Sequence, residues 1–117
     1  MGYWVYLARC ADNSIYTGAT TDLYRRVREH NAGSSKGQGA KYTSSHRPVT
    51  LAQAWEVESW SDALRLEHAI KKCGKLEKEQ FILLPQKINQ LAVKHKFTFQ
   101  ISVISKEFHK KIEDSLD

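Results

Sequence analysis

The sequence predicts an α+β fold in which a three-stranded antiparallel sheet is flanked by helices, with an additional C-terminal strand and helix. Two observations predict the core of this fold. Residues 3–10 and 14–18 are short runs rich in aromatic and β-branched side chains on either side of a turn, which is typical of a β-hairpin. Residues 62–73 place apolar side chains at helical spacing and stop before Gly74, as an amphipathic helix does.

The predicted hairpin carries one tyrosine on each strand, Tyr6 and Tyr16. Facing residues of antiparallel strands point to the same side of a sheet, whereas neighbours along one strand alternate. The two tyrosines therefore share a face only if the loop has an odd number of residues. We predict a three-residue loop centred on Asn13, which places both side chains on one side of the sheet.

The first helix is predicted over residues 20–33, because Thr or Asp can cap its start and Gly33 is placed to end it. Leu23 and Val27 lie four residues apart and should face the core. From Gly33 to Pro48 the chain holds small, polar and basic residues without an apolar period, so we expect a surface loop. Its length is typical of a loop with a function.

The third strand is predicted over residues 50–57, and it can pair with the hairpin into one antiparallel sheet. Its alternate side chains should lie on one side of the sheet: Leu51, Gln53, Trp55 and Val57. Ser61 is the candidate N-cap of the helix that follows. Its apolar stripe comprises Ala63, Leu66, Ile70 and Cys73.

The C-terminal third predicts two more helices, over residues 76–84 and 86–96, with Ile88, Leu91 and Ala92 on one face of the second. Residues 97–104 alternate as a strand does, and residues 106–116 place Phe108, Ile112 and Leu116 at helical spacing. The added strand could extend the sheet edge or pair with a second copy in a homodimer. We therefore predict a core domain over residues 1–84 and an extension over residues 85–117 that packs on it or on a partner.

Composition favours an intracellular protein with a polyanionic partner. The chain has 18 basic and 13 acidic side chains, a net charge of +5, which favours phosphate-rich ligands such as nucleic acid. Two cysteines are too few for a secreted disulfide scaffold and indicate a reducing cytoplasm. No apolar run approaches the roughly 20 residues of a membrane span. Cys10, Cys73, His30 and His46 lack the spacing of zinc ligands.

Basic side chains on the first helix are candidates for phosphate binding. Arg26 and His30 stand four residues apart, so both can reach a single phosphate, and Arg25 and Arg28 flank them. Taken on these residues alone, the pattern favours a solvated basic helix face over phosphate binding.

Glu67 lies at the edge of an apolar helical stripe, where an inward carboxylate needs a cation as partner. A metal ion or an arginine would serve, and the alternative is a side chain that reaches back to solvent. Tyr6 and Tyr16 could be packing residues. A cation nearby could instead lower the pKa of a phenol and make it a usable base.

Short strings along the chain together resemble the GIY-YIG nuclease superfamily, and its small stand-alone bacterial members in particular. They are WVY at 4–6, YTG at 16–18, RRVREHN at 25–31, GAKYT at 39–43, RPV at 47–49 and EHAIKK at 67–72. The resemblance runs from Tyr3 to about Leu84. It implies a three-stranded antiparallel sheet with flanking helices, and a catalytic set of Tyr6, Tyr16, Arg26, His30 and Glu67.

The resemblance implies a metal-dependent endonuclease that acts on DNA rather than RNA. It also implies that cleavage can depend on the structure of the DNA and can take part in repair or recombination. Glu67 would hold one Mg²⁺ or Mn²⁺, and Arg26 would stabilise charge on the phosphate. Tyr16 would accept a proton from the attacking water, while Tyr6 and His30 would orient that water. Two other hypotheses stay open, a non-catalytic nucleic-acid-binding module and an interaction protein that docks through its C-terminal strand and helix.

A second group of residues is expected to bind the phosphate backbone without reading bases. It comprises Arg25, Arg28, Lys36, Lys41 and Arg47, from the first helix and the loop after it. Replacing one side chain that binds a phosphate of duplex DNA should change the log-log slope of affinity against salt concentration by about 0.9.

Overall fold

A computed structural model describes residues 2–32 and 47–115 of the chain. Its elements follow in the order β1 Tyr3–Arg9, β2 Ile15–Thr20, α1 Leu23–Ala32, β3 Thr50–Val57, α3 Trp60–Lys71, α4 Lys75–Leu83, η1 Pro85–Lys87, α5 Ile88–Lys94, β4 Ser102–Val103 and α6 Lys106–Asp114. The four strands form one antiparallel sheet in the order β2-β1-β3-β4. The predicted α+β class, with three core strands and an additional C-terminal strand and helix, is confirmed.

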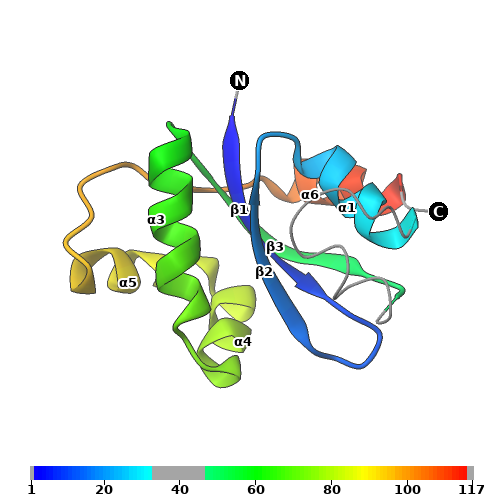
Figure 1. Cartoon of the computed structure of the whole chain (residues 1–117), viewed down its shortest axis with the longest axis horizontal. Helices are drawn as coiled ribbons and strands as arrows, with labels where there is room; N and C mark the ends of the chain where they lie inside the picture. The colour runs from blue at the N-terminus through cyan, green and yellow to red at the C-terminus, as the bar shows by residue number, and fades with distance from the viewer. Residues whose placement is uncertain (1, 33–46, 116–117) are drawn as a thin grey trace.

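The sheet separates two sets of helices (Figure 1). Helices α3, α4 and α5 lie on one side of it, and α1 and α6 lie on the other. Each helix within residues 2–32 and 47–115 falls short of the length and apolar character that a membrane crossing requires.

The hairpin of β1 and β2 has the odd loop that the sequence predicts. Ala8 pairs with Tyr16 and Tyr6 pairs with Gly18, so both tyrosines lie on one face. The turn is centred on Asp12 rather than on Asn13, since the backbone of Cys10 bonds to that of Ser14. Asn13 takes a positive φ of 70°, the left-handed conformation that Asn tolerates in a three-residue hairpin loop.

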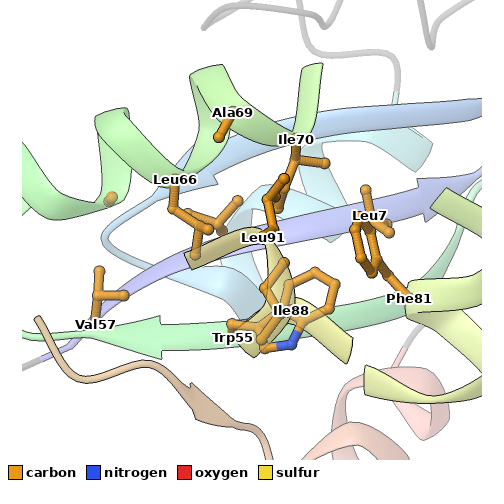
Figure 2. Close-up of a cluster of buried hydrophobic side chains, with 11 residues drawn as sticks. Leu7, Trp55, Val57, Leu66, Ala69, Ile70, Phe81, Ile88 and Leu91 are labelled. Carbon is orange, nitrogen blue, oxygen red and sulfur yellow. The ribbon is translucent and has the colours of Figure 1, made fainter. Parts of the chain in front are cut away.

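The first side of the sheet, which we call the apolar face, is closed by α3, α4 and α5. Its buried members are Val5, Leu7, Trp55, Val57, Ala63, Leu66, Ala69, Ile70, Phe81, Ile88 and Leu91. Figure 2 shows side chains from these helices and from β1 and β3 turned toward one another. The Trp55 indole meets Phe81 edge to face, and its N–H donates to the Pro85 carbonyl at 3.1 Å.

The opposite side, which we call the site face, is covered by α1 and α6. Its buried apolar members are Tyr6, Ala8, Cys10, Leu23, Val27, Val49, Leu51, Ala54 and Ile112. Leu23 and Val27 of α1 face the core as predicted. Buried Arg26 and His30 of α1 lie beside them, so this face also contains polar groups.

The prediction that Leu51 shares a side with Trp55 is wrong, because β3 has an irregularity opposite β1. Leu7 pairs with Gln53, but the next residue, Ala8, pairs with Leu51, so β3 has one extra residue there. A single extra residue reverses the alternation of side chains beyond it. Leu51 therefore packs in the site face, while Trp55 packs in the apolar face.

The N-cap predicted for α3 is also wrong by two residues. Ser59 has extended backbone angles, and its hydroxyl accepts a hydrogen bond from the Asp62 amide at 3.1 Å, whereas Ser61 lies inside the helix. The helix therefore starts at Trp60. An N-cap side chain accepts a hydrogen bond from the backbone amide two or three residues later, and Asp62 stands three residues after Ser59. Ser59 therefore caps the helix in place of Ser61.

The C-terminal segment extends the sheet within the same chain. The predicted strand over residues 97–104 is reduced to Ser102–Val103, which pairs with β3. The segment before β4 packs three side chains against the apolar face, those of Phe97, Phe99 and Ile101. The alternation of apolar residues in the sequence therefore reflects burial of these side chains and not hydrogen bonding along a long strand. In α6, Ile112 is fully buried. The predicted neighbour Leu116 lies outside the described residues.

Candidate active site

A pocket lies along the edge strand β2, between α1 and α3, with a volume of about 570 Å³. Four of the five predicted catalytic residues line it, namely Tyr6, Tyr16, Arg26 and Glu67. The other lining residues are Gly18, Ala19, Thr20, Thr21, Arg25, Glu29 and Trp60. Residues from a hairpin and two helices that are distant in sequence thus meet around one cavity.

The fifth predicted residue, His30, lies beneath the pocket and is joined to its floor. His30 Nε2 is 2.8 Å from the Tyr6 hydroxyl, and each residue is only 1% exposed. Gly18 makes room for this pair, because a Cβ there would lie 2.5 Å from the Tyr6 hydroxyl oxygen. Any side chain at position 18 would therefore displace the Tyr6 ring.

Tyr16 completes a cluster of three rings on the site face. Its ring centroid lies 6.4 Å from that of Tyr6 and 5.5 Å from that of His30. The Tyr6 and His30 rings meet edge to face at 5.9 Å. Contacts of this kind hold aromatic side chains in fixed orientations. The two hydroxyl groups are therefore presented on a rigid floor.

The expectation that a nearby cation lowers the pKa of these phenols is not met. Burial raises the pKa of Tyr6 far above its usual value, and the opposing charge of Arg26 offsets only part of that rise. Burial also raises the pKa of Tyr16, where Arg26 lowers it and Glu67 adds to the rise. Both phenols are thus protonated at neutral pH, because desolvation of the phenolate outweighs the attraction of the guanidinium.

His30 is neutral at physiological pH. Burial, together with the positive charge of Arg26, lowers the pKa of His30 to about 4. Since Tyr6 is protonated and His30 is uncharged, one proton occupies the bond between them, donated by either the hydroxyl or the ring N–H. The buried pair is therefore a hydrogen bond between two neutral groups.

Arg26 is placed by the start of α1. The Asp22 carboxylate accepts a hydrogen bond from the Arg25 amide at 3.0 Å, which caps the helix as the sequence predicts for Thr or Asp. Arg26 follows on the buried side of the helix and is only 7% exposed, and its guanidinium lies 3.4 Å from the Glu29 carboxylate. Its charge acts on Tyr6, Tyr16 and His30.

Glu67 projects from the second turn of α3 into the same pocket. Its side chain is 12% exposed, and the carboxylate lies 3.4 Å from the Lys71 ammonium. Within the described residues, no group of three or more His, Cys, Asp or Glu side chains could enclose a metal ion. A single carboxylate in an open pocket suits a hydrated Mg²⁺ or Mn²⁺, which keeps waters and takes phosphate oxygens as further ligands. Glu67 fits such an ion.

The predicted phosphate-binding residues are only partly brought together. Arg25 lines the pocket. Arg28 stacks over the ring of Tyr24 at 5.5 Å, and Arg47 donates to the Asn31 carbonyl at 3.2 Å, both outside the pocket lining. Lys36 and Lys41 lie outside the described residues.

Among the lining residues that sequence reasoning did not assign to the site are the carboxylate of Glu29 and the aromatic ring of Trp60. Glu29 follows Arg26 by three residues, a spacing that could have indicated their ion pair. Trp60 falls in no predicted element, because an N-cap at Ser61 leaves it outside the helix. The YTG string contains Gly18, but its close contact with Tyr6 depends on the strand register.

Comparisons with known proteins match the same part of the chain. Residues 2–80 match the family described as the GIY-YIG catalytic domain. A UPF0213 protein of Haloquadratum walsbyi is 46% identical over 75% of this chain and 94% of its own length. One from Halobacterium salinarum is 48% identical over 64% of this chain and 92% of its own. The solution NMR structure of a UPF0213 protein from Bacillus halodurans is 33% identical, covers 72% of this chain and 85% of its own, and has a TM-score of 0.46.

Proposed function

This chain belongs to the GIY-YIG catalytic domain family, and on that premise we propose that it is a metal-dependent endonuclease that cuts phosphodiester bonds in DNA. One observation carries the proposal. Tyr6, Tyr16, Arg26 and Glu67 come from three separate elements and line a single pocket, with His30 bonded beneath it. Two basic and two acidic side chains line this pocket together with the tyrosines. Hydrophobic packing does not require charged side chains there, so their presence supports a functional site.

Arg26 is the residue that we propose to stabilise the phosphate in the transition state. Its guanidinium is largely buried, so its charge is poorly screened by water and acts strongly within the pocket. Glu29 holds it from one side at 3.4 Å. Arg25 supplies a second positive charge at the rim, where it would hold the backbone without reading bases.

Glu67 is the residue that we propose to hold one Mg²⁺ or Mn²⁺. When bound, such an ion would neutralise charge on the phosphate oxygens. In the protein alone, the carboxylate is paired with Lys71. The ammonium would therefore have to move away from the carboxylate when the cation binds.

Tyr16 is the group that we propose to accept a proton from the attacking water, with Tyr6 and His30 orienting that water through their hydrogen bond. Because the pKa of Tyr16 is raised, its phenolate is a minor species at neutral pH. The rate of cleavage should therefore increase with pH as the phenolate fraction grows. Tyr16→Phe should remove that dependence together with most of the activity.

DNA as substrate, structure specificity and a role in repair or recombination are parts of this proposal that rest on the family resemblance. A cytoplasmic location is supported by the free thiols of Cys10 and Cys73. A homodimer through β4 would have to use its outer edge, since its inner edge pairs with β3 of the same chain.

The test is a cleavage assay with Mg²⁺ or Mn²⁺ on single-stranded, duplex, flap and four-way DNA and on matched RNA. Glu67→Gln should abolish cleavage and Arg26→Ala should strongly reduce it, while both variants keep the fold and most of the nucleic-acid affinity. For Arg26 the loss should be about a hundredfold or more, since a preorganised charge in a transition state contributes about 3 kcal/mol. Arg65→Ala, an exposed arginine on α3, is the matched control and should cut as wild type does.

Two results would reject the enzyme. In one, purified wild-type protein cuts none of these substrates with either metal. In the other, Glu67→Gln and Arg26→Ala cut as fast as Arg65→Ala. A protein that binds nucleic acid but cuts nothing would be the non-catalytic binding module instead.

A further inference from the structure

Trp60 is an exposed aromatic side chain at the edge of the active-site pocket. It is the first residue of α3, lines the pocket and is 40% exposed. The other two tryptophans are less accessible, since Trp55 is fully buried and Trp4 is half-buried against Phe108. A single exposed apolar side chain is ordinary on a protein surface, but this one lies in the lining of the pocket that also contains Arg26 and Glu67.

The helix brings this indole onto the same stripe as the proposed metal ligand. Trp60, Leu64 and Glu67 are spaced by four and three residues, so they lie along one side of α3. The rise of an α-helix separates Trp60 from Glu67 by about 10 Å along the axis. A base attached to a phosphate at Glu67, or to the neighbouring nucleotide, can cover that distance.

The indole is also held in place before any ligand arrives. Its ring contacts that of Tyr3 from β1, with centroids 6.3 Å apart and planes inclined at 51°. Such a contact limits rotation of the side chain while leaving part of the ring open to solvent. Trp60 thus presents a fixed aromatic surface rather than a freely rotating one.

The pocket is larger than a phosphate group and has two chemically different walls. Its volume of about 570 Å³ falls in the range that holds a drug-sized ligand. On α1 the two arginines Arg25 and Arg26 outnumber the single carboxylate of Glu29, so this wall has a net positive charge. On α3 the ring of Trp60 adds an aromatic surface beside Glu67. A nucleotide has the matching pair of groups, an anionic phosphate and a flat base.

We propose that Trp60 stacks on an unpaired base next to the phosphate that is cut, so that the substrate is a strand with unpaired nucleotides there, such as single-stranded DNA or a flap. This inference rests on the proposed function and adds the substrate class. In an uninterrupted duplex the faces of the bases are covered by their neighbours, and only their edges reach the grooves. An indole can stack on a base only where the strand is open.

The experiment measures binding of fluorescent oligonucleotides to the full chain in chelator, where cleavage is prevented. The probes are a single strand, a flap and a blunt duplex of the same sequence. Trp60→Ala should weaken binding to the single strand and the flap about 5- to 150-fold, the range expected for loss of one stacked base. Binding to the blunt duplex should change less than about twofold.

Three further variants separate stacking from other effects. Trp60→Phe keeps an aromatic ring and should retain most of the affinity, whereas Trp60→Leu keeps only apolar area and should behave as Trp60→Ala does. Leu64→Ala is the matched control, because Leu64 lies on the same stripe of α3 and is 43% exposed. It should bind all three probes nearly as wild type does.

A 2-aminopurine placed successively along the single strand should show quenched fluorescence at one position in wild type, and that quenching should be absent in Trp60→Ala. The proposal is overturned if Trp60→Ala loses no more affinity than Leu64→Ala, or if it loses as much for duplex as for single strand. If Trp60→Ala does not fold, the Phe and Leu variants decide. Equal affinity of these two overturns stacking.

Failure of stacking and failure of catalysis are distinguishable. If wild type cuts DNA and Trp60→Ala binds and cuts every substrate equally well, the nuclease stands and the stacking role is wrong. If the single strand binds in a Trp60-dependent manner but no substrate is cut with Mg²⁺ or Mn²⁺, stacking stands and the enzyme is rejected. If wild type binds no nucleic acid, both are wrong.

Discussion

The two faces of the sheet use the same central strand for different purposes. Along β1, Val5 and Leu7 point into the apolar face, while Tyr6 and Ala8 point into the site face. The apolar face buries hydrocarbon and indole side chains under three helices, and its buried polar members by strand register are Thr17 and Gln53, both paired with Leu7. The site face includes a phenol, an imidazole and a guanidinium that are almost as deeply buried. Because successive side chains of a strand point to opposite faces of the sheet, neighbouring residues of β1 serve the core on one side and the candidate site on the other.

This division explains why the polar groups of the site face can be buried at all. Burying them costs desolvation, which is partly offset by the Tyr6–His30 hydrogen bond and the Arg26–Glu29 ion pair. Burial of apolar side chains in both faces offsets the remaining cost. Mutations in the apolar face should therefore reduce stability alone, whereas mutations of the polar groups in the site face should also reduce activity.

The largest stability effect is expected from Trp55→Ala on the apolar face. Trp55 is fully buried and its N–H bonds to Pro85, so the variant creates a cavity and leaves a carbonyl without its partner. Unfolding free energy should fall by about 4 kcal/mol, measured by urea denaturation. Trp60→Ala removes the same type of side chain from an exposed position and should cost only about 1 kcal/mol. Equal losses would contradict the assignment of the core to this face.

A slightly smaller effect is expected from Ile112→Ala in α6, because Ile112 is fully buried in the site face although it lies beyond the family match. Its loss should cost about 3 kcal/mol. Leu76→Ala, at a position 81% exposed, should change stability by less than about 0.5 kcal/mol. If Ile112→Ala is equally mild, α6 is a detachable accessory. The predicted boundary at residue 84 would then mark an independent domain.

Gly18→Ala should combine both signatures. The added Cβ would lie 2.5 Å from the Tyr6 hydroxyl oxygen and would displace the ring from His30. Overpacking of this kind costs about 2 kcal/mol. Misplacement of Tyr6 should also reduce cleavage about a hundredfold under conditions where the variant is fully folded. Unchanged activity in Gly18→Ala would mean that the position of Tyr6 is not important for the chemistry.

The sequence was informative where local patterns decide the outcome. The odd hairpin loop, the inward side of α1 and the bounds of β3 follow from turn residues and hydrophobic period. The side on which Leu51 lies could not be predicted, because one extra residue in a strand is invisible to its alternation. Likewise, apolar and polar residues alternate around Phe97 and Phe99, although this segment does not belong to a strand. Such alternation indicates which side chains are buried, and it does not require the hydrogen bonds of a sheet.

The residues of the candidate site could be named from the sequence, but their electrostatics could not. The resemblance supplied Tyr6, Tyr16, Arg26 and Glu67, and the structure brings them to one pocket. The direction of the tyrosine pKa shifts was not predictable, because it depends on how burial compares with the charge of Arg26. Trp60 was missed for a similar reason. Its exposure depends on a helix start that two nearby serines could each have defined.

The smallest predicted effect is the acid sensitivity that His30 gives to the site face. An unfolded histidine has a pKa near 6.5, whereas that of His30 is lowered to about 4, so the unfolded chain binds its proton first as the pH falls. Stability from this residue is therefore complete above about pH 6.5 and decreases toward pH 4. Between about pH 8 and pH 5.5 the free energy of unfolding should fall by about 1.4 kcal/mol.

The measurement compares the urea midpoints of wild type and His30→Gln across this pH range. The variant lacks the titrating ring and should show a nearly flat profile. Glu79 does not confuse the result, because Arg9 lowers the pKa of its carboxyl and its contribution is lost only at more acidic pH. Parallel profiles in the two proteins would show that His30 is not buried in its neutral form, and that the site face tolerates charge there.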